Sequence, residues 1–174
     1  LVVCLLFQYA GMSFVDFAHL KERNIKNGIL DYNRQKTGTP MRLEILDTAE
    51  LMRKELMGDK RPASGYLFPF LSGTKTGYEA YLEYNAALSR FNRNLKALKK
   101  AAGIASDVTS YTIRHSFAMA LKEQNVPIEM ISELLGHKSI KTTQIYLRSF
   151  SLEKMTEVNS TCFGCVYNYV SKVG

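Results

Sequence analysis

Three side chains in the second half of the chain are of the types that can break and form phosphate esters. Arg114, His137 and Tyr146 supply a guanidinium, an imidazole and a phenol, and Tyr111 lies three residues before Arg114, on the same helical face. A deprotonated phenol is a nucleophile, and a guanidinium can hold two oxygens of a phosphate at once. His137 follows Gly136 directly at the predicted end of one helix, and Tyr146 lies nine residues later in the next helix. We expect these helix ends to converge and to bring the three groups together.

Each of these residues alone has a plainer interpretation. An arginine on a helix is usually a surface charge, a histidine at a helix end is usually a cap, and a tyrosine on an amphipathic helix usually belongs to the core. The combination at this spacing favours a common site over three separate structural roles.

Three predicted helices position these groups. In the first two of them apolar residues recur at the spacing of one buried stripe, and a serine that can cap the first turn precedes the first and the third. Proline suits the first turn of a helix and glycine suits its C-terminal end. In chain order, Ser110 caps a helix that buries Ile113, Phe117 and Leu121; Pro127 opens one that buries Ile128, Ile131 and Leu135 and ends at Gly136; and Ser139 caps the one that runs through Tyr146.

Helical and extended patterns alternate through the rest of the chain. Gly38 and Pro40 separate two runs that are compatible with β-strands, which is typical of a hairpin loop. The predicted elements are a buried helix that ends by residue 12, a short helix over 14–20, strands over 29–36 and 41–46, a helix over 49–57 capped by Asp47 and Thr48, a loop over 58–77 with Tyr66, Leu67 and Phe68 turned inward, and a helix over 78–102 that buries Leu88, Phe91, Leu95, Leu98 and Ala102.

The composition is that of a globular protein, with 46% hydrophobic and 22% charged residues in 174. The formal net charge is +7, and a basic excess favours a polyanionic partner because phosphates release counterions when they are bound. A solvated helix face explains the most basic stretch equally well. That stretch contains Arg90, Arg93, Lys96, Lys99 and Lys100 and no acidic residue.

The cysteines and the apolar N-terminus exclude several classes of protein. Three cysteines, an odd number, argue against a disulfide scaffold. Cys162 and Cys165 form half of a zinc-ribbon pattern without a second half, so we expect no metal. The apolar stretch 1–7 is too short to span a bilayer and lacks a basic leader. We therefore expect a cytoplasmic protein, cut within a helix so that a preceding domain is missing from this chain.

The stretch from Tyr111 onwards resembles the tyrosine recombinases, and more narrowly the integrases of bacterial mobile elements of the Bacteroides type. That family carries a histidine, two spacers and an arginine, then Leu-Gly-His, and then the nucleophilic tyrosine nine residues on. The corresponding residues here are Tyr111, Arg114, 135–137 and Tyr146. The runs RHSFA and TTQIYL are also similar to the sequences of the family. By this resemblance Tyr146 is the nucleophile, Arg114 holds the phosphate, and His137 donates to the same phosphate or assists proton movement.

The resemblance extends over about residues 8–158. The family places a catalytic lysine on a β-hairpin, and Lys36 before Thr37-Gly38 matches it. Two residues depart from the family pattern: Ser13 occupies the position of the first catalytic arginine, and Tyr111 occupies the position of the histidine. Side chains alternate along a strand, so Tyr32, Arg34 and Lys36 would share a face, and Arg34 is our candidate to replace the missing arginine.

The resemblance implies a fold that is mainly α with a small antiparallel β-sheet (α+β), formed by the hairpin and one edge strand. The catalytic domain would occupy residues 1–158, followed by a C-terminal tail over 159–174. The N-terminal core-binding domain of the family would be absent from this chain.

The implied activity is site-specific recombination or integration of DNA. Tyr146 would attack the scissile phosphodiester to give a 3′-phosphotyrosyl intermediate, and Lys36 would protonate the departing 5′-oxygen, with no cofactor, metal or ATP. The partner would be double-stranded DNA, without a membrane. The full-length protein would form a tetramer on paired sites and exchange a C-terminal helix after Phe150, whereas the isolated domain would be a monomer.

Three alternatives stay open. A non-catalytic DNA-binding module built around residues 110–135 would explain the basic balance, but not the spacing of His137 and Tyr146. A catalytically impaired recombinase remnant is favoured by Ser13 and Tyr111. A type IB topoisomerase shares the chemistry, although the spacing from Leu-Gly-His to the tyrosine is more similar to that of integrases.

Overall fold

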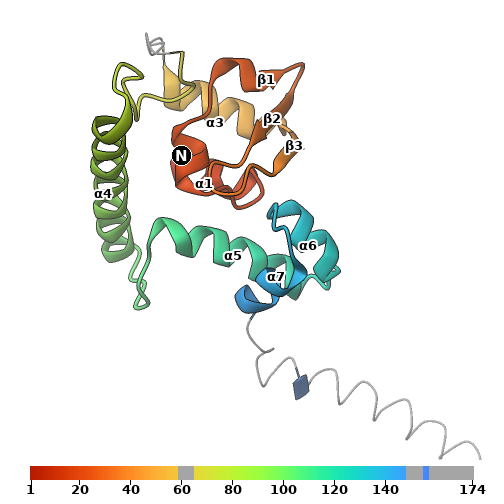
Figure 1. Cartoon of the computed structure of the whole chain (residues 1–174). Coiled ribbons are helices and arrows are strands. Elements are labelled where there is room, and N and C mark those ends of the chain that lie inside the picture. Colours follow the sequence, from red (N-terminus) through yellow and green to blue (C-terminus); the bar gives the residue numbers. More distant parts are fainter. Residues whose placement is uncertain (59–64, 148–154, 157–174) are drawn as a thin grey trace, which may run out of the picture.

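The structure, a computed structural model, describes residues 1–58, 65–147 and 155–156 (Figure 1). It is mainly helical with one small antiparallel sheet, which confirms the predicted fold class. In chain order the elements are α1 (Val2–Gln8), α2 (Phe14–Ala18), the 3₁₀ helix η1 (Glu22–Asn24), β1 (Ile25–Lys26), β2 (Ile29–Asn33), β3 (Pro40–Glu44), α3 (Asp47–Met57), α4 (Gly77–Ala101), α5 (Ser110–Glu123), α6 (Ile128–Leu134) and α7 (Ile140–Tyr146).

The sheet has the strand order β1-β2-β3, and both neighbouring pairs are antiparallel. Along β2, Leu30 and Tyr32 are buried whereas Asp31 and Asn33 are exposed, so one face of the sheet covers the core. The hairpin between β2 and β3 is confirmed, but both strands are shorter than predicted. The chain turns immediately after Asn33, because the Gly38 amide donates to the Arg34 carbonyl at 2.8 Å and closes the loop.

Two hydrophobic clusters form the interior of the described chain. In the larger cluster, Phe14 stacks on Phe91 with ring centroids 4.6 Å apart, and Phe17 stacks on Phe68 at 4.1 Å. These contacts join α2 to α4 and to the segment after residue 65. Leu67 and Phe68 are buried, as predicted. The smaller cluster contains Ala118, Ile131 and Leu135.

Helix α5 links the two clusters. Ile113 belongs to the larger cluster and Ala118, further along the helix, belongs to the smaller one. Figure 1 shows α5 running from the end of α4 towards α6 and α7. Arg114, the residue after Ile113, therefore lies at the junction between the two hydrophobic clusters.

Helix α4 continues beyond the core that it covers. Phe91 and Leu95 are buried as predicted, but Leu98 is 55% exposed and Ala102 is exposed. The members of the larger cluster on α4 end at Leu95, so the predicted stripe is too long by two positions. The reason is that helical periodicity persists in the sequence where the neighbouring elements no longer reach.

Some helix starts differ from the predicted caps. Leu46, not Asp47, precedes the first turn of α3, and Thr109, not Ser110, caps α5 with a capping box. Ser139 caps α7 as predicted, since its hydroxyl accepts from the Lys141 amide at 3.3 Å.

None of the described helices is both long and apolar enough to cross a membrane. The described residues also contain no group of three or more His, Cys, Asp or Glu side chains that could hold a metal ion. Cys162 and Cys165 lie outside the described residues, as does most of the segment after Phe150 that we expect to be exchanged between subunits.

Candidate active site

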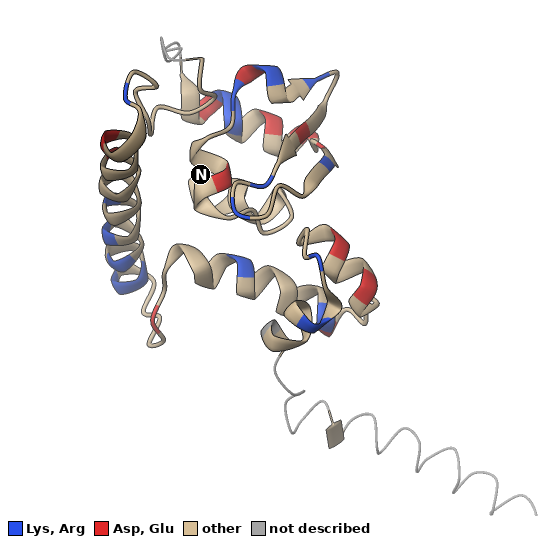
Figure 2. Cartoon of the chain, viewed as in Figure 1, with Lys and Arg blue, Asp and Glu red and all other residues tan. Residues whose placement is uncertain are grey.

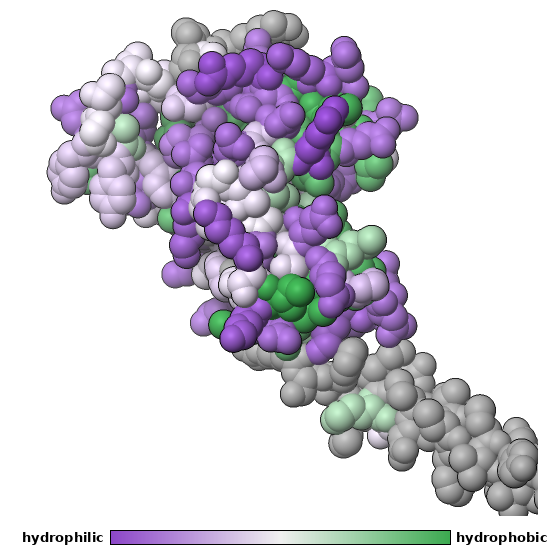
Figure 3. All heavy atoms as spheres, turned by 45° about the vertical axis from the view of Figure 1, so that its right-hand side comes forward, coloured by the Kyte–Doolittle hydropathy of each residue, from purple (hydrophilic) through white to green (hydrophobic). Residues whose placement is uncertain are grey.

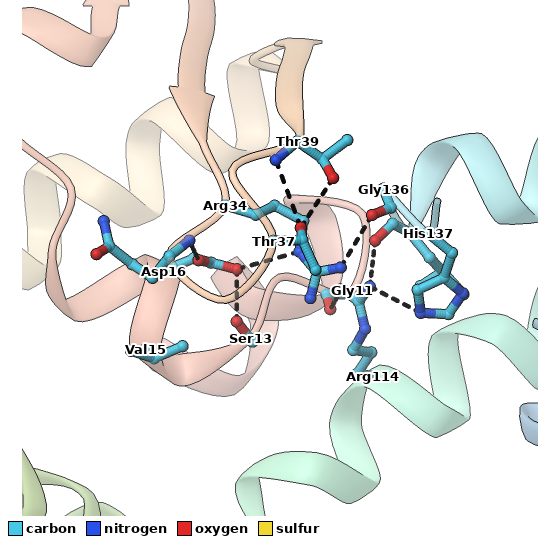
Figure 4. Close-up of polar contacts among 12 residues, drawn as sticks. Gly11, Ser13, Val15, Asp16, Arg34, Thr37, Thr39, Arg114, Gly136 and His137 are labelled. Carbon is cyan, nitrogen blue, oxygen red and sulfur yellow. Dashed lines mark hydrogen bonds and ion pairs between the residues drawn. The ribbon is translucent and has the colours of Figure 1, made fainter. Parts of the chain in front are cut away.

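Arg114 joins parts of the chain that are far apart in the sequence. It lies on α5 at the junction of the two clusters and is only 4% exposed. Its Nη1 donates to the Gly11 carbonyl at 3.0 Å, and its Nη2 donates to the carbonyl of Leu135 at the end of α6 (Figure 4). The guanidinium is thereby fixed between the bend before α2 and the turn before α7.

His137 lies beside this guanidinium. Its Nε2 is 3.4 Å from Arg114 Nη2, and its Nδ1 is 2.9 Å from the Thr143 hydroxyl. An arginine only donates, so Nε2 is the acceptor and the proton of the neutral ring is on Nδ1, which donates to Thr143. Burial, together with the charges of Arg114 and Arg34, lowers the pKa of His137 to about 4. The imidazole is therefore neutral at pH 7.

Arg34 enters the same site from the end of β2. It is 7% exposed; its Nη1 donates to the Gly136 carbonyl at 3.0 Å, and its Nε lies 3.5 Å from Asp16 Oδ2. The buried carboxylate of Asp16 also accepts from the Ser13 hydroxyl at 2.5 Å and from the Gln35 amide at 2.7 Å. Asp16 thus ties both Arg34 and the start of the hairpin loop to α2.

Two glycines permit these close approaches. Gly136 has a φ of +60°, and a Cβ at this position would overlap the Met41 sulfur and lie 2.8 Å from Arg34 Cδ. Gly11 has a φ of +63°, and its Cβ would lie 3.0 Å from the Phe117 ring. A side chain at either position would push apart the segments whose carbonyls hold the two arginines.

The site has an excess of positive charge. Within the described ranges, the buried charged side chains are Arg34, Arg114 and Asp16, and all three belong to this site. Since His137 is neutral, one buried positive charge exceeds the buried negative charge. Burial of charge in a poorly polar interior is costly, and an anion beside these groups reduces the cost. Two guanidinium groups at one turn, one of them in contact with the imidazole of His137, are suited to the non-bridging oxygens of a phosphate.

Lys36 is not on the strand face that the sequence predicts. Tyr32 and Arg34 are both buried, as the alternation requires, but β2 ends at Asn33 and Lys36 is exposed on the hairpin loop. The prediction of a shared face fails for Lys36 because the chain has already turned. Lys36 therefore lies on the loop that begins directly after Arg34.

Tyr111 and Tyr146 lie one helical turn from residues of the site. Tyr111 is on the first turn of α5, one turn before Arg114, and is 60% exposed. Tyr146 is the last residue of α7. Thr143 lies one turn earlier on the same helical face and binds His137, so it fixes α7 to the site. That the phenol of Tyr146 shares this pocket stays a prediction.

Sequence reasoning assigned no role in the site to Asp16 or Thr143. Asp16 carries a usable signal, because an acidic residue between the apolar residues Phe14 and Phe17 on one short helix must be buried with a partner. Thr143 carries no signal beyond its place between His137 and Tyr146.

The surface around the site is mainly polar. Figure 3, in which the side of the molecule that carries the sheet and α6 is turned forward, shows mostly hydrophilic residues with small separate hydrophobic areas. The basic run lies on the C-terminal half of α4 (Figure 2), where Lys99 pairs with Asp107 at 3.1 Å. The other basic residues of the run are exposed: Arg90, Arg93, Lys96 and Lys100.

Comparison with known proteins identifies relatives of this chain. The profile of the phage integrase family matches residues 2–153. Tyrosine recombinase XerD of Lacticaseibacillus casei is 52% identical over 54 residues, which are 31% of this chain and 18% of that protein. Tyrosine recombinase XerC of Rickettsia typhi is 41% identical over 75 residues, which are 43% of this chain and 24% of that protein.

Solved structures share the fold. The crystal structure of XerA recombinase has a TM-score of 0.66 at 23% identity and covers 90% of this chain and 55% of its own. The Tn1549 transposon integrase in complex with a circular intermediate DNA has a TM-score of 0.65 at 15% identity and covers 91% and 57%. The chain thus spans under a quarter of each of these two relatives and over half of these two structures. The narrower likeness to Bacteroides-type integrases stays a prediction.

Proposed function

The chain belongs to the phage integrase family, and on this premise we propose that it cuts and rejoins double-stranded DNA as a site-specific recombinase, with Tyr146 as its nucleophile. The observation that carries the proposal is the convergence of two buried guanidinium groups on the turn of residues 135–137, which leads into the helix of Tyr146.

The proposed reaction is a pair of transesterifications at phosphorus. The phenolic oxygen of Tyr146 attacks the scissile phosphodiester, the bond from phosphorus to the 5′-oxygen breaks, and a 3′-phosphotyrosyl ester and a 5′-hydroxyl form. A 5′-hydroxyl of a second strand then attacks this ester, which restores the phosphodiester and the phenol. One ester bond forms for each that breaks, so the reaction needs no ATP, metal or cofactor.

The arginines neutralise the phosphate. Arg114 and Arg34 approach the site from α5 and from the hairpin, and each presents a planar set of N–H donors. Arg34 takes the role of the arginine that Ser13 replaces. Asp16 supports this assignment because it holds the Arg34 guanidinium in place while Ser13 donates to the same carboxylate.

His137 and Lys36 handle protons. The pKa of His137 is lowered by burial and by the two arginines, and a bound phosphate would offset those positive charges. His137 can then donate through Nε2 to a phosphate oxygen. Lys36 would protonate the departing 5′-oxygen, and its exposure on a loop that begins at the site supports this role.

Covalent trapping tests the proposal. A pool of short nicked duplexes of random sequence lets the cleaved end diffuse away, so a phosphotyrosyl adduct accumulates and survives SDS electrophoresis. The wild-type chain should form this adduct, and Tyr146→Phe should bind DNA equally well but form none. Tyr81→Phe, at an exposed tyrosine of α4, is the matched control and should keep the wild-type yield. A normal adduct yield from Tyr146→Phe would exclude Tyr146 as the nucleophile.

A second function, an impaired recombinase remnant that only binds DNA, is favoured by the serine at position 13 and the exposed tyrosine at position 111. The same gel separates the two, because a remnant would bind the duplex and give no adduct even as wild type. In either case we propose a monomer for the isolated chain and a tetramer of the full-length protein on paired sites, which sedimentation with and without DNA measures.

A further inference from the structure

An open polar pocket of about 380 Å³ adjoins the active site. Asp16 lines the pocket and also holds Arg34, so a single carboxylate lies between the pocket and the guanidinium. The other walls come from the segment after α2, from the end of β2 with the start of the hairpin loop, and from Tyr66. We propose that this pocket binds a backbone phosphate of the cleaved DNA strand, next to the phosphate at the active site; the proposal rests on the proposed function.

The charges of the pocket favour an anion. Lys21 and Arg23 line it and supply two cations. Among the described residues that line it, Asp16 is the only acid, and its charge is already compensated by Arg34 and by the donors of Ser13 and Gln35. The pocket therefore presents a net positive charge to a ligand.

Neutral donors complete the site. The side chains of Asn33 and Gln35 are exposed, line the pocket and carry amide N–H groups. His19 also lines it; its Nδ1 donates to the Val15 carbonyl at 2.7 Å, so the neutral ring carries its proton on Nδ1. Amide and cationic donors together are the usual partners of DNA phosphates.

The Lys21 side of the pocket is held in place before any ligand binds. The Lys21 amide donates to Asn24 Oδ1 at 2.8 Å, and the Asn24 side-chain amide donates to the Asp31 carbonyl at 2.8 Å. Lys21 also pairs with Tyr66 as an isolated antiparallel bridge, and its Nζ lies 5.3 Å from the centre of the Tyr66 ring. A preorganised cation loses less conformational freedom on binding than a free lysine does.

The chain itself connects the pocket to the chemistry. Arg34 contacts the active site, Gln35 lines the pocket, and Lys36 begins the exposed loop. Phosphates follow one another along a DNA strand at about 3.4 Å of helix axis. A strand with one phosphate between Arg34 and Arg114 therefore brings an adjacent phosphate towards the pocket.

The salt dependence of DNA binding tests this pocket. The test variant is Lys21→Gln/Arg23→Gln, and Lys26→Gln/Arg42→Gln is the matched control, which removes one lysine and one arginine from exposed positions on β1 and β3. Fluorescence anisotropy with a short duplex of mixed sequence gives the affinity at each salt concentration, and urea denaturation verifies that both variants are folded. Loss of the one phosphate that the pocket binds should lower the slope of log affinity against log salt by about 0.9, which makes the loss of affinity between 50 and 200 mM salt about 3.5-fold smaller.

The outcomes separate the pocket from the catalytic proposal. A slope that falls in the test variant and stays at the wild-type value in the control supports the pocket, even if the wild type forms no covalent adduct. Equal slopes in the two variants, or a wild type that does not bind the duplex at low salt, would overturn the pocket. If the wild type forms an adduct and the two variants have equal slopes, the catalytic proposal is kept and the phosphate-binding pocket is rejected.

Discussion

Gly136→Ala should destabilise the fold much more than Gly103→Ala. Both glycines directly follow the C-cap of a helix, with φ values of +60° and +67°. A Cβ at Gly136 would overlap the Met41 sulfur and lie 2.8 Å from Arg34 Cδ, whereas a Cβ at Gly103 meets nothing within 4 Å. The left-handed backbone costs an alanine about 1–2 kcal/mol at either position. Overpacking adds about 1–3 kcal/mol at Gly136 alone.

Urea denaturation followed by circular dichroism measures this difference. With a slope of about 2 kcal/mol per M, the midpoint of Gly136→Ala should lie about 0.5–1.5 M below that of Gly103→Ala. The displaced Arg34 should also lose its hydrogen bond to the carbonyl of residue 136, so the adduct yield should fall in this variant and not in the control. Equal midpoints for the two variants would refute the close packing of the hairpin on the turn before α7.

Two further predictions concern the charged groups of the site. The pKa of His137 is lowered from 6.5 to about 4, so between these pH values the unfolded chain binds a proton that the folded chain does not. The free energy of unfolding should therefore fall as the pH drops through this window, by about 2 kcal/mol after screening at a half-buried ring, and His137→Gln should lack this component in denaturation curves at pH 7 and 4.5. Arg34→Ala should lower the rate of adduct formation about 10²–10³-fold, as expected for the loss of one preorganised donor, whereas the exposed Arg42→Ala should leave the rate unchanged. An unchanged rate in Arg34→Ala would remove Arg34 as the substitute for the missing arginine.

Local signals explain how much of the fold could be predicted. Caps, glycines and apolar spacing act within one or two helical turns, and they gave the order and type of the helices around the site. The hairpin followed from Gly38 and Pro40 in the same way. The position of Arg114 between α1–α2 and α6–α7 was expected only as a convergence of helix ends, and its carbonyl partners at Gly11 and Leu135 were not foreseen.

What the sequence did not reveal depends on contacts between distant segments. The burial of Asp16 follows from its pairing with Arg34 at the end of β2, and the exposure of Lys36 follows from a strand that ends at Asn33. The exposed Leu98 is a third case, because periodicity describes a helix face but not how far its neighbours extend. In each case the outcome depends on residues elsewhere in the chain, which a local pattern does not include.

The tripeptide Leu135-Gly136-His137 shows why a short motif can carry so much of the site. The Leu135 carbonyl accepts from Arg114, the Gly136 carbonyl accepts from Arg34, and His137 Nε2 accepts from Arg114. Three consecutive residues therefore hold both guanidinium groups, and the one without a side chain is the one against which the hairpin packs. Two of the three acceptors are backbone atoms. The identity of the residues therefore matters mainly at Gly136, where there is no room for a side chain, and at His137, whose ring contacts Thr143 of α7. The excess positive charge is thus concentrated on the turn that leads directly into the helix of Tyr146, where an attacked phosphate would need it.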